Sequence, residues 1–376
     1  MFTEVESILQ EFGRDVESLQ PEPAATVGLS FITEDGYESF QYHWAVSPMV
    51  DGSQRLSILE HVDGDPMFFA AGRSADPGRL YQVFSKLVKR FDPLMMKIAA
   101  ESEDEEDVQQ FLQLREMVLP YLVKLDKSTS ELLIPSIQDG QSAFVIDFKN
   151  ASDNWGPAVP SGSQPLVLPE FAVVCAVNDR AKFAKAMGVY DEFARDMLNL
   201  IATQAGEDFP DEIALPQATS MELDGGATAY YYPAPQLEDL GLDRAFRPNL
   251  LLSDKWAIYS LTLGHSERLL EAKSLPTAAG PFSRQDQPLV AASGVNFPSL
   301  VNALESWFRY ADDMGAFADL ELDQDGPFQL SADGLLQSFE TMFVVLRCYR
   351  GVESVTYVED GATVTHSRVR FSDIPW

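Results

Sequence analysis

Three segments of the chain repeat one pattern of apolar and polar positions. Each begins with a proline, continues as an apolar run and then reaches an Asp or Asn that precedes apolar residues at helical spacing. The segments begin at Pro66, Pro169 and Pro288. The Asp and Asn positions are Asp76, Asn178 with Asp179, and Asn296. An apolar run is typical of a central strand, and Asp or Asn favours a helix start, so the pattern predicts a strand followed by a helix in each segment.

An Asp-Gly pair follows each segment downstream. These pairs are Asp139-Gly140, Asp224-Gly225 and Asp360-Gly361. Asp-Gly is typical of tight hairpins because both turn residues adopt positive φ. The first pair lies 73 residues after its proline and the third lies 72 after its own, whereas the middle spacing is 55. We interpret this as duplication of a strand–helix–helix–strand–hairpin–strand unit, with a middle copy that lacks most of its second helix. Further hairpins are expected at Asp35-Gly36 and near Ser253 to Lys255.

Hairpin-linked strands combined with helices predict an α+β fold with a mainly antiparallel sheet and helices packed on one face. The polar segments 149–164 and 273–287 indicate boundaries between units. We therefore expect an N-terminal unit over 1–150 with a leading amphipathic helix, a middle unit over 151–275 and a C-terminal unit over 276–376.

With its apolar strands, capped helices and closing Asp-Gly hairpins, the stretch 60–376 resembles uncharacterised bacterial families built from duplicated α+β units. Those families have no established activity, so the resemblance implies a fold and no catalytic residue. Many such proteins look secreted or membrane-anchored, which the N-terminal sequence does not support.

The net charge of the chain limits the classes of partner that it is expected to bind. The chain has 376 residues, with 58 Asp and Glu against 27 Lys and Arg, which gives a formal net charge of −31. Such a surface repels nucleic-acid backbones and anionic lipids, so neither is an expected partner. The first basic residue is Arg14, so we expect no secretory leader, and no apolar stretch is long enough to span a membrane. The sequence as it stands favours the cytoplasm, and a removed or misassigned leader would favour the cell envelope.

One acidic segment is the best candidate for a metal site. Asp319, Glu321, Asp323 and Asp325 alternate with other residues and precede Gly326. Alternate oxygen ligands before a glycine resemble the start of a calcium loop, but the twelfth position, which should be a bidentate Glu, is Ala332. The alternation equally describes a strand that ends in a turn, which is the favoured interpretation. No other cofactor is expected.

Other side chains that could carry function have ordinary structural interpretations. Trp155 lies in a polar loop, where it either folds back onto the body, as we expect, or offers a contact surface. Cys175 and Cys348 lie in apolar runs and are expected to be buried thiols, and whether they pair stays open. We expect the four histidines to be structural or surface residues and Ser266 to cap a short helix.

No nucleophile elbow, phosphate-binding loop or zinc spacing is present in the sequence. We therefore expect a non-enzymatic acidic protein that binds a protein or a small ligand. The alternatives are a hydrolase with carboxylates at the junction between units and a calcium-assisted envelope protein.

Overall fold

The structure is a computed structural model. It describes residues 2–101, 105–153, 155–156, 159, 161–205, 217–232, 243–276, 280–316 and 332–372.

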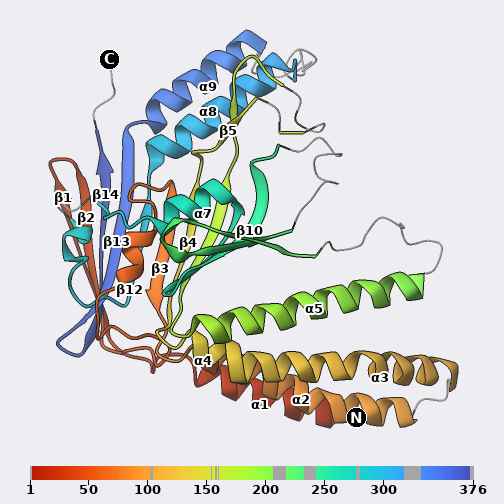
Figure 1. Ribbon diagram of the computed structural model, residues 1–376. Coiled ribbons are helices and arrows are strands. Elements are labelled where there is room, and N and C mark those ends of the chain that lie inside the picture. The colour runs from red at the N-terminus through yellow and green to blue at the C-terminus, as the bar shows by residue number, and fades with distance from the viewer. Residues whose placement is uncertain are drawn as a thin grey trace, which may run out of the picture.

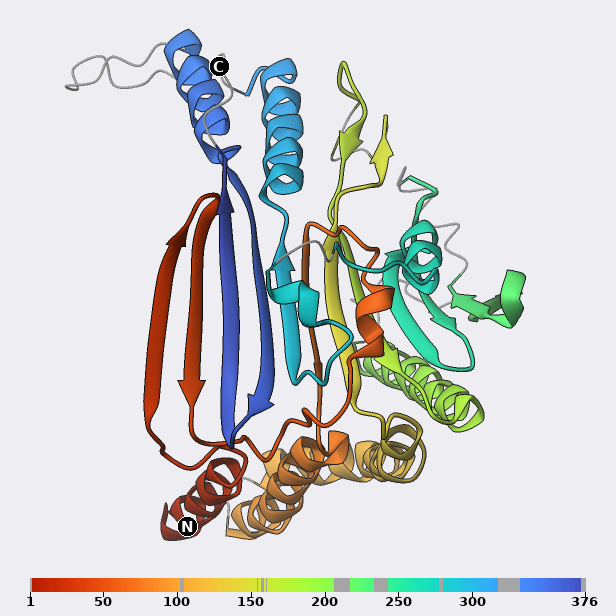
Figure 2. The same cartoon turned by 90° about the vertical axis from the view of Figure 1, so that its left-hand side faces the viewer.

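A twelve-stranded sheet organises the molecule (Figures 1 and 2). Its strand order is β1-β2-β14-β13-β12-β3-β4-β7-β11-β10-β9-β8, and every neighbouring pair is antiparallel. The strands are β1 Thr26–Thr33, β2 Gly36–His43, β3 Phe68–Arg73, β4 Gln141–Asp147, β7 Glu170–Ala176, β8 Thr219–Glu222, β9 Thr228–Tyr231, β10 Phe246–Leu252, β11 Trp256–Thr262, β12 Ala291–Val295, β13 Tyr349–Glu359 and β14 Ala362–Phe371. A separate small hairpin pairs β5 Ala151–Ser152 with β6 Leu166–Val167.

Long helices lie at both ends of the strands, and shorter helical segments lie against the sheet (Figure 1). The helices are α1 Phe2–Glu17, α2 Pro77–Glu101, α3 Glu105–Ser128, α4 Ile134–Ser136, α5 Arg180–Ala205, α7 Leu263–Leu270, α8 Phe297–Asp313 and α9 Ala332–Leu346. The short 3-10 helices are η1 Ser57–His61, η4 Asp224–Gly226 and η5 Pro281–Arg284, and η2 Thr129–Leu133 is a π-helix.

One face of the sheet carries the main core, and we call it the covered face. Inward side chains of the central strands, such as Phe69, Val145 and Val174, are at most 1% exposed. They pack beneath η1, α7 and η5, which lie in front of the sheet in Figure 2. The opposite face, the open face, lies in the angle between α5 and the α8–α9 pair (Figure 1).

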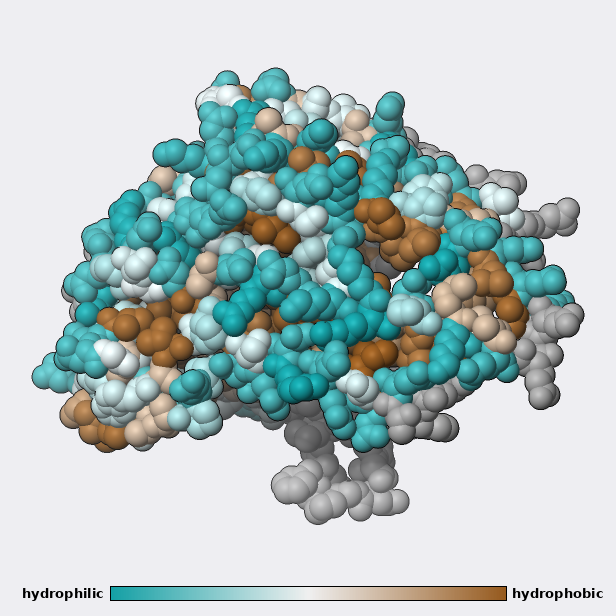
Figure 3. All heavy atoms as spheres, turned by 90° about the horizontal axis from the view of Figure 1, so that it is seen from below, coloured by the Kyte–Doolittle hydropathy of each residue, from teal (hydrophilic) through white to brown (hydrophobic). Residues whose placement is uncertain are grey.

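Helices α1, α2, α3 and α5 form an arm that leaves the lower end of the sheet (Figure 1). Ion pairs tie its members together: Lys97 of α2 pairs with Glu4 of α1 at 2.7 Å, and Arg115 of α3 pairs with Asp92 of α2 at 2.8 Å. Seen from below, hydrophobic patches are interspersed with hydrophilic side chains (Figure 3). Exposed apolar residues of the arm include Phe84 and Val88 of α2.

The α+β class and the mainly antiparallel sheet are confirmed. The predicted N-caps are confirmed as well, because Asp76, Asp179 and Asn296 accept backbone N–H bonds at 2.9, 3.0 and 3.1 Å. The expected hairpin turns form at Asp35-Gly36, Asp360-Gly361 and Ser253 to Lys255, and Asp224-Gly225 lies between β8 and β9.

The prediction of a hairpin at Asp139-Gly140 is wrong, because this pair joins α4 to β4 and does not connect two strands. Gly140 does adopt a φ of +71°, and its backbone N–H donates to Ile137 O at 2.9 Å. Positive φ serves helix ends as well as hairpins, so Asp-Gly alone does not separate the two.

The duplication inferred from the Asp-Gly spacing is not confirmed. The topology nevertheless contains a related correspondence, since β3–α2–α3–β4–β7 and β12–α8–α9–β13–β14 have the same order of long helices and large-sheet strands once the short elements η2, α4, β5 and β6 are left out. β3 and β12 are neighbours at the middle of the sheet, and each series continues outward from there.

The unit boundaries at 150 and 275 stay predictions, and strands from all three predicted units join the one large sheet. Among the described residues, no helix is long and apolar enough to cross a lipid bilayer.

Candidate functional site

The open face carries an apolar pocket of about 730 Å³ between α5 and the strands β4, β7, β9, β10 and β11. Phe144, Phe171, Val173 and Tyr259 form much of its floor and are 37–41% exposed. This volume lies in the range of small-molecule sites, which are typically concave and lined by apolar and aromatic side chains.

Strand alternation builds the floor of the apolar pocket. In β7, Ala172 and Val174 point into the core, whereas Phe171 and Val173 alternate with them on the open face. Phe171 stacks on Phe144 of the neighbouring strand, with ring centroids 6.4 Å apart. The side facing α5 is formed partly by small residues of that helix. Gly188 lines the pocket, and no atom lies within 4 Å of the position that a Cβ would occupy there.

The described walls of the apolar pocket carry one charged side chain, Asp191. Arg195 pairs with this carboxylate from the next helical turn, and the Tyr232 hydroxyl donates to it at 2.5 Å. The Tyr259 hydroxyl donates to Met187 Sδ at 2.6 Å, and burial raises the pKa of Tyr259 above its usual range. The polar atoms of Asp191, Tyr232 and Tyr259 are thus engaged with protein groups, and most of the remaining described lining residues are apolar or aromatic.

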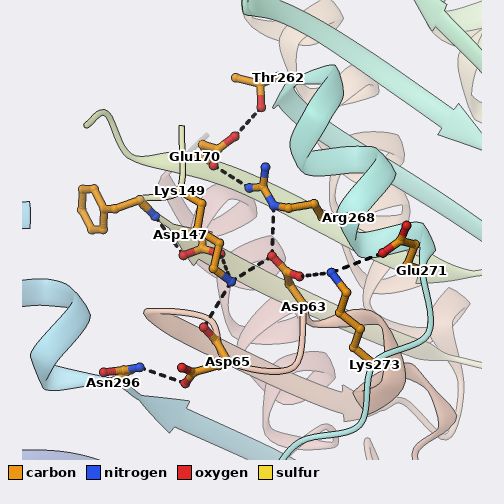
Figure 4. Close-up of polar contacts among 11 residues, drawn as sticks. Asp63, Asp65, Asp147, Lys149, Glu170, Thr262, Arg268, Glu271, Lys273 and Asn296 are labelled. Carbon is orange, nitrogen blue, oxygen red and sulfur yellow. Dashed lines mark hydrogen bonds and ion pairs between the residues drawn. The ribbon is translucent and has the colours of Figure 1, made fainter. Parts of the chain in front are cut away.

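A charged cluster lies on the covered face, where the ends of several strands meet (Figure 4). Its centre is Asp63, whose side chain is 2% exposed and contacts three cations. Lys149 and Arg268 approach Asp63 Oδ2 at 2.9 and 3.1 Å, and Lys273 approaches Oδ1 at 2.9 Å. The cluster therefore joins the loop before β3 to the segments that follow β4 and β11.

Two further buried carboxylates complete the charged cluster. Asp147 lies 2.8 Å from Lys149, and Glu170 accepts from Arg268 at 2.6 Å and from the Thr262 hydroxyl at 2.5 Å. Glu170 and Asp147 are at most 1% exposed. These carboxylates are enclosed and already paired, so a substrate would have to displace their cations to reach them. Their arrangement therefore suits a structural role, which is to join the ends of the strands.

The pKa values of Asp63 and Asp147 are shifted in opposite directions. Burial raises the pKa of Asp63, but the hydrogen bonds and charges of Lys273, Lys149 and Arg268 outweigh it and lower this pKa to about 2. Burial dominates at Asp147 and raises its pKa above the usual range, although Lys149 partly opposes the shift. Three cations contact Asp63, whereas fewer reach Asp147. The charged form of Asp63 is therefore stabilised more strongly than that of Asp147.

The candidate calcium ligands Asp319, Glu321, Asp323 and Asp325 lie outside the described residues. Within the described part of the chain, no three His, Cys, Asp or Glu side chains are grouped as a metal site would need. Trp155 is 4% exposed, and its indole Nε1 donates to Leu166 O at 2.7 Å, so its ring packs against the body. Cys175 and Cys348 are free thiols, and burial raises the pKa of Cys175 to about 11.

Ser266 is not the helix cap that the sequence suggested. Thr262 is the N-cap of α7 and accepts from His265 N at 3.3 Å. Ser266 lies inside the helix, fully buried, and its hydroxyl donates to Asn249 Oδ1 at 2.7 Å. His265 is also fully buried, and burial lowers its pKa to about 4, so the ring is neutral at pH 7.

Sequence reasoning missed the residues of the apolar pocket because they come from segments far apart in the chain. One signal was present: β7 is apolar on both of its faces. That pattern predicts a central strand buried on both sides, whereas in the structure one of its faces lines a cavity.

Comparisons of the chain with protein-family models, with curated proteins and with solved structures gave no match.

Proposed function

We propose that this protein binds an uncharged, apolar small molecule in the apolar pocket, as a binding protein and not as an enzyme. The observation that carries the proposal is a cavity of about 730 Å³ whose floor consists of half-exposed aromatic and aliphatic side chains. Covering such side chains is favourable by roughly 25 cal/mol per Å² of apolar area removed from water.

The charged side chains in the walls of the apolar pocket indicate which ligand charge it can accept. Among the described lining residues there is no Lys or Arg, and the single carboxylate, Asp191, is already paired with Arg195. An anionic head group would have no cationic partner in this cavity and would lose its hydration on entry. The net charge of −31 disfavours anions further.

The alternative of a hydrolase has one matching feature, the convergence of Asp63, Asp147 and Glu170 from distant segments. The pKa of Asp63 is lowered and that of Asp147 is raised, as the pKa values of an acid–base pair must differ. Their burial and cation pairing support a structural role instead, so binding is the function we favour.

A binding titration with Nile red, an uncharged apolar dye, tests this proposal. Gly188→Trp places a side chain in the pocket, and Gly13→Trp in α1 is the matched control, because both glycines are helical and have open space at the Cβ position. Replacing a helical glycine does not weaken the helix.

We expect saturable Nile red binding to the wild type and to Gly13→Trp. Gly188→Trp should bind the dye at least about tenfold more weakly than the wild type. A tenfold loss of affinity corresponds to roughly 1.4 kcal/mol of binding free energy. Equal binding by all three proteins, or no saturable binding by the wild type, contradicts the proposal.

A further inference from the structure

A second, smaller cavity of about 250 Å³ lies beside the charged cluster, and we call it the arginine cavity. It is built where β10 begins and where β11 passes into α7. The charged side chains among its described lining residues are those of Arg244, Arg247, Arg268 and Glu170. In a chain with 58 acidic and 27 basic side chains, a cavity with this excess of arginine is the reverse of the average surface.

Glu170 offsets the charge of Arg268, with which it pairs, and does not contact Arg247. Both carboxylate oxygens of Glu170 are engaged, one with Arg268 and the other with the Thr262 hydroxyl. The guanidinium of Arg268 is fixed in turn, since Asp63 and Glu170 take its Nε and Nη2. Its Nη1 lies beside Gly264, 3.9 Å from where a Cβ would stand, and Gly264 lines the cavity.

Arg247 supplies a second positioned guanidinium. It is partly buried and stands over the ring of Tyr231, with its Cζ 4.9 Å from the ring centroid. Within the described residues no carboxylate pairs with Arg247. A guanidinium held by an aromatic ring keeps its N–H donors available, and its planar fork matches the oxygens of carboxylate and phosphate.

The start of α7 adds to the positive field. Leu263 and Gly264 are its first two residues, and both line the cavity. The first N–H groups of a helix have no acceptor inside the helix, and the helix dipole favours an anion at this end.

We propose that the arginine cavity binds the phosphate or carboxylate group of a small molecule. The cavity volume suits a compact anion, and the net charge of −31 opposes a nucleic-acid backbone. This site is separate from the apolar pocket, so either proposal can fail without the other.

Calorimetric titration with inorganic phosphate tests the inference, with chloride added to hold the ionic strength constant. A parallel titration with succinate distinguishes the two anion classes. Arg247→Gln removes the stacked guanidinium, and Arg247→Lys keeps the charge without the fork. Arg14→Gln, an exposed arginine of α1, is the control for loss of one positive charge.

We expect saturable one-site binding of phosphate, of succinate or of both. Arg247→Gln should weaken it by about tenfold or more, as the loss of a charge-assisted hydrogen bond implies, with an intermediate value for Arg247→Lys. Arg14→Gln should bind as the wild type does. Absence of saturable binding by the wild type to either anion overturns the proposal, and so does equal affinity of Arg247→Gln. If Arg247→Gln fails to fold, Arg247→Met takes its place in the same comparison.

Discussion

The two faces of the sheet differ in how deeply their aromatic side chains are buried. On the covered face, Phe69 is 1% exposed and packs against Phe282, with ring centroids 5.7 Å apart. On the open face, Phe171 is 41% exposed and lies in the floor of the apolar pocket. An aromatic side chain on the first face completes a core, whereas the same side chain on the second leaves apolar surface for a ligand. We therefore propose that packing on the covered face serves stability and that the open face serves apolar binding.

The largest expected difference is between two phenylalanines. Phe69→Ala opens a cavity in a closed core and should lower the free energy of unfolding by about 3–5 kcal/mol. Phe171→Ala removes a side chain that already contacts water and should cost about 1–2 kcal/mol. Urea unfolding of both variants measures the difference. Equal losses would mean that the open face is as enclosed as the covered one.

The charged cluster gives a second large effect on the covered face. Asp63→Asn leaves Lys149, Arg268 and Lys273 without their shared carboxylate and should destabilise the fold by about 2 kcal/mol or more. Asp147→Asn is the matched control, expected to cost about 1 kcal/mol or less because burial already disfavours its charge. The ranking is tested by urea unfolding at neutral pH, and the reverse order would contradict it.

Acid should weaken the cluster in a defined pH range. The pKa of Asp63 is about 2 in the folded protein against 3.8 as the ordinary value, so its charge stabilises the fold above pH 3.8. That contribution, about 2 kcal/mol, is lost as the pH falls from 3.8 through 2. The raised pKa of Asp147 acts with the opposite sign, since its contribution is present at low pH and is lost as the pH rises through the folded value.

Comparison of the wild type with Asp63→Asn isolates the Asp63 contribution. The stability difference between them should shrink as the pH is lowered from 4 toward 2, followed by urea unfolding at each pH. A difference that stays constant over this range would mean that Asp63 does not titrate with a lowered pKa.

The smallest effect concerns the half of the open face away from the apolar pocket, where hydroxyls replace aromatics. Thr356 and Thr365 face one another across β13 and β14, with their hydroxyl oxygens 3.1 Å apart, and both are partly exposed. Thr356→Val should change stability by about 0.5 kcal/mol or less in thermal or urea unfolding. A loss several times larger would show that this half is covered and not open.

The sequence predicted the elements better than the site. The apolar runs after Pro169 and Pro288 include β7 and β12, and Asp76, Asp179 and Asn296 cap helices as expected, because caps and strands depend on neighbouring residues. Asp139-Gly140 failed because a helix end and a hairpin both use positive φ.

The sites depend on residues that are distant in sequence. Asp63, Lys149 and Arg268 meet only because β3, β4 and β11 belong to one sheet, and no local spacing records that meeting. Likewise, the apolar character of Phe171 and Val173 was visible, but which strands and helix enclose them depends on strand order.

The central claim is that the apolar pocket takes up an uncharged apolar ligand. Calorimetric titration with 1-decanol at several temperatures tests it most directly, because burial of apolar surface gives a negative heat-capacity change. We predict saturable binding of one decanol per chain with a negative heat-capacity change in the wild type and in Gly13→Trp, and its loss in Gly188→Trp. No saturable heat in the wild type, or an unchanged heat-capacity signal in Gly188→Trp, would contradict the account.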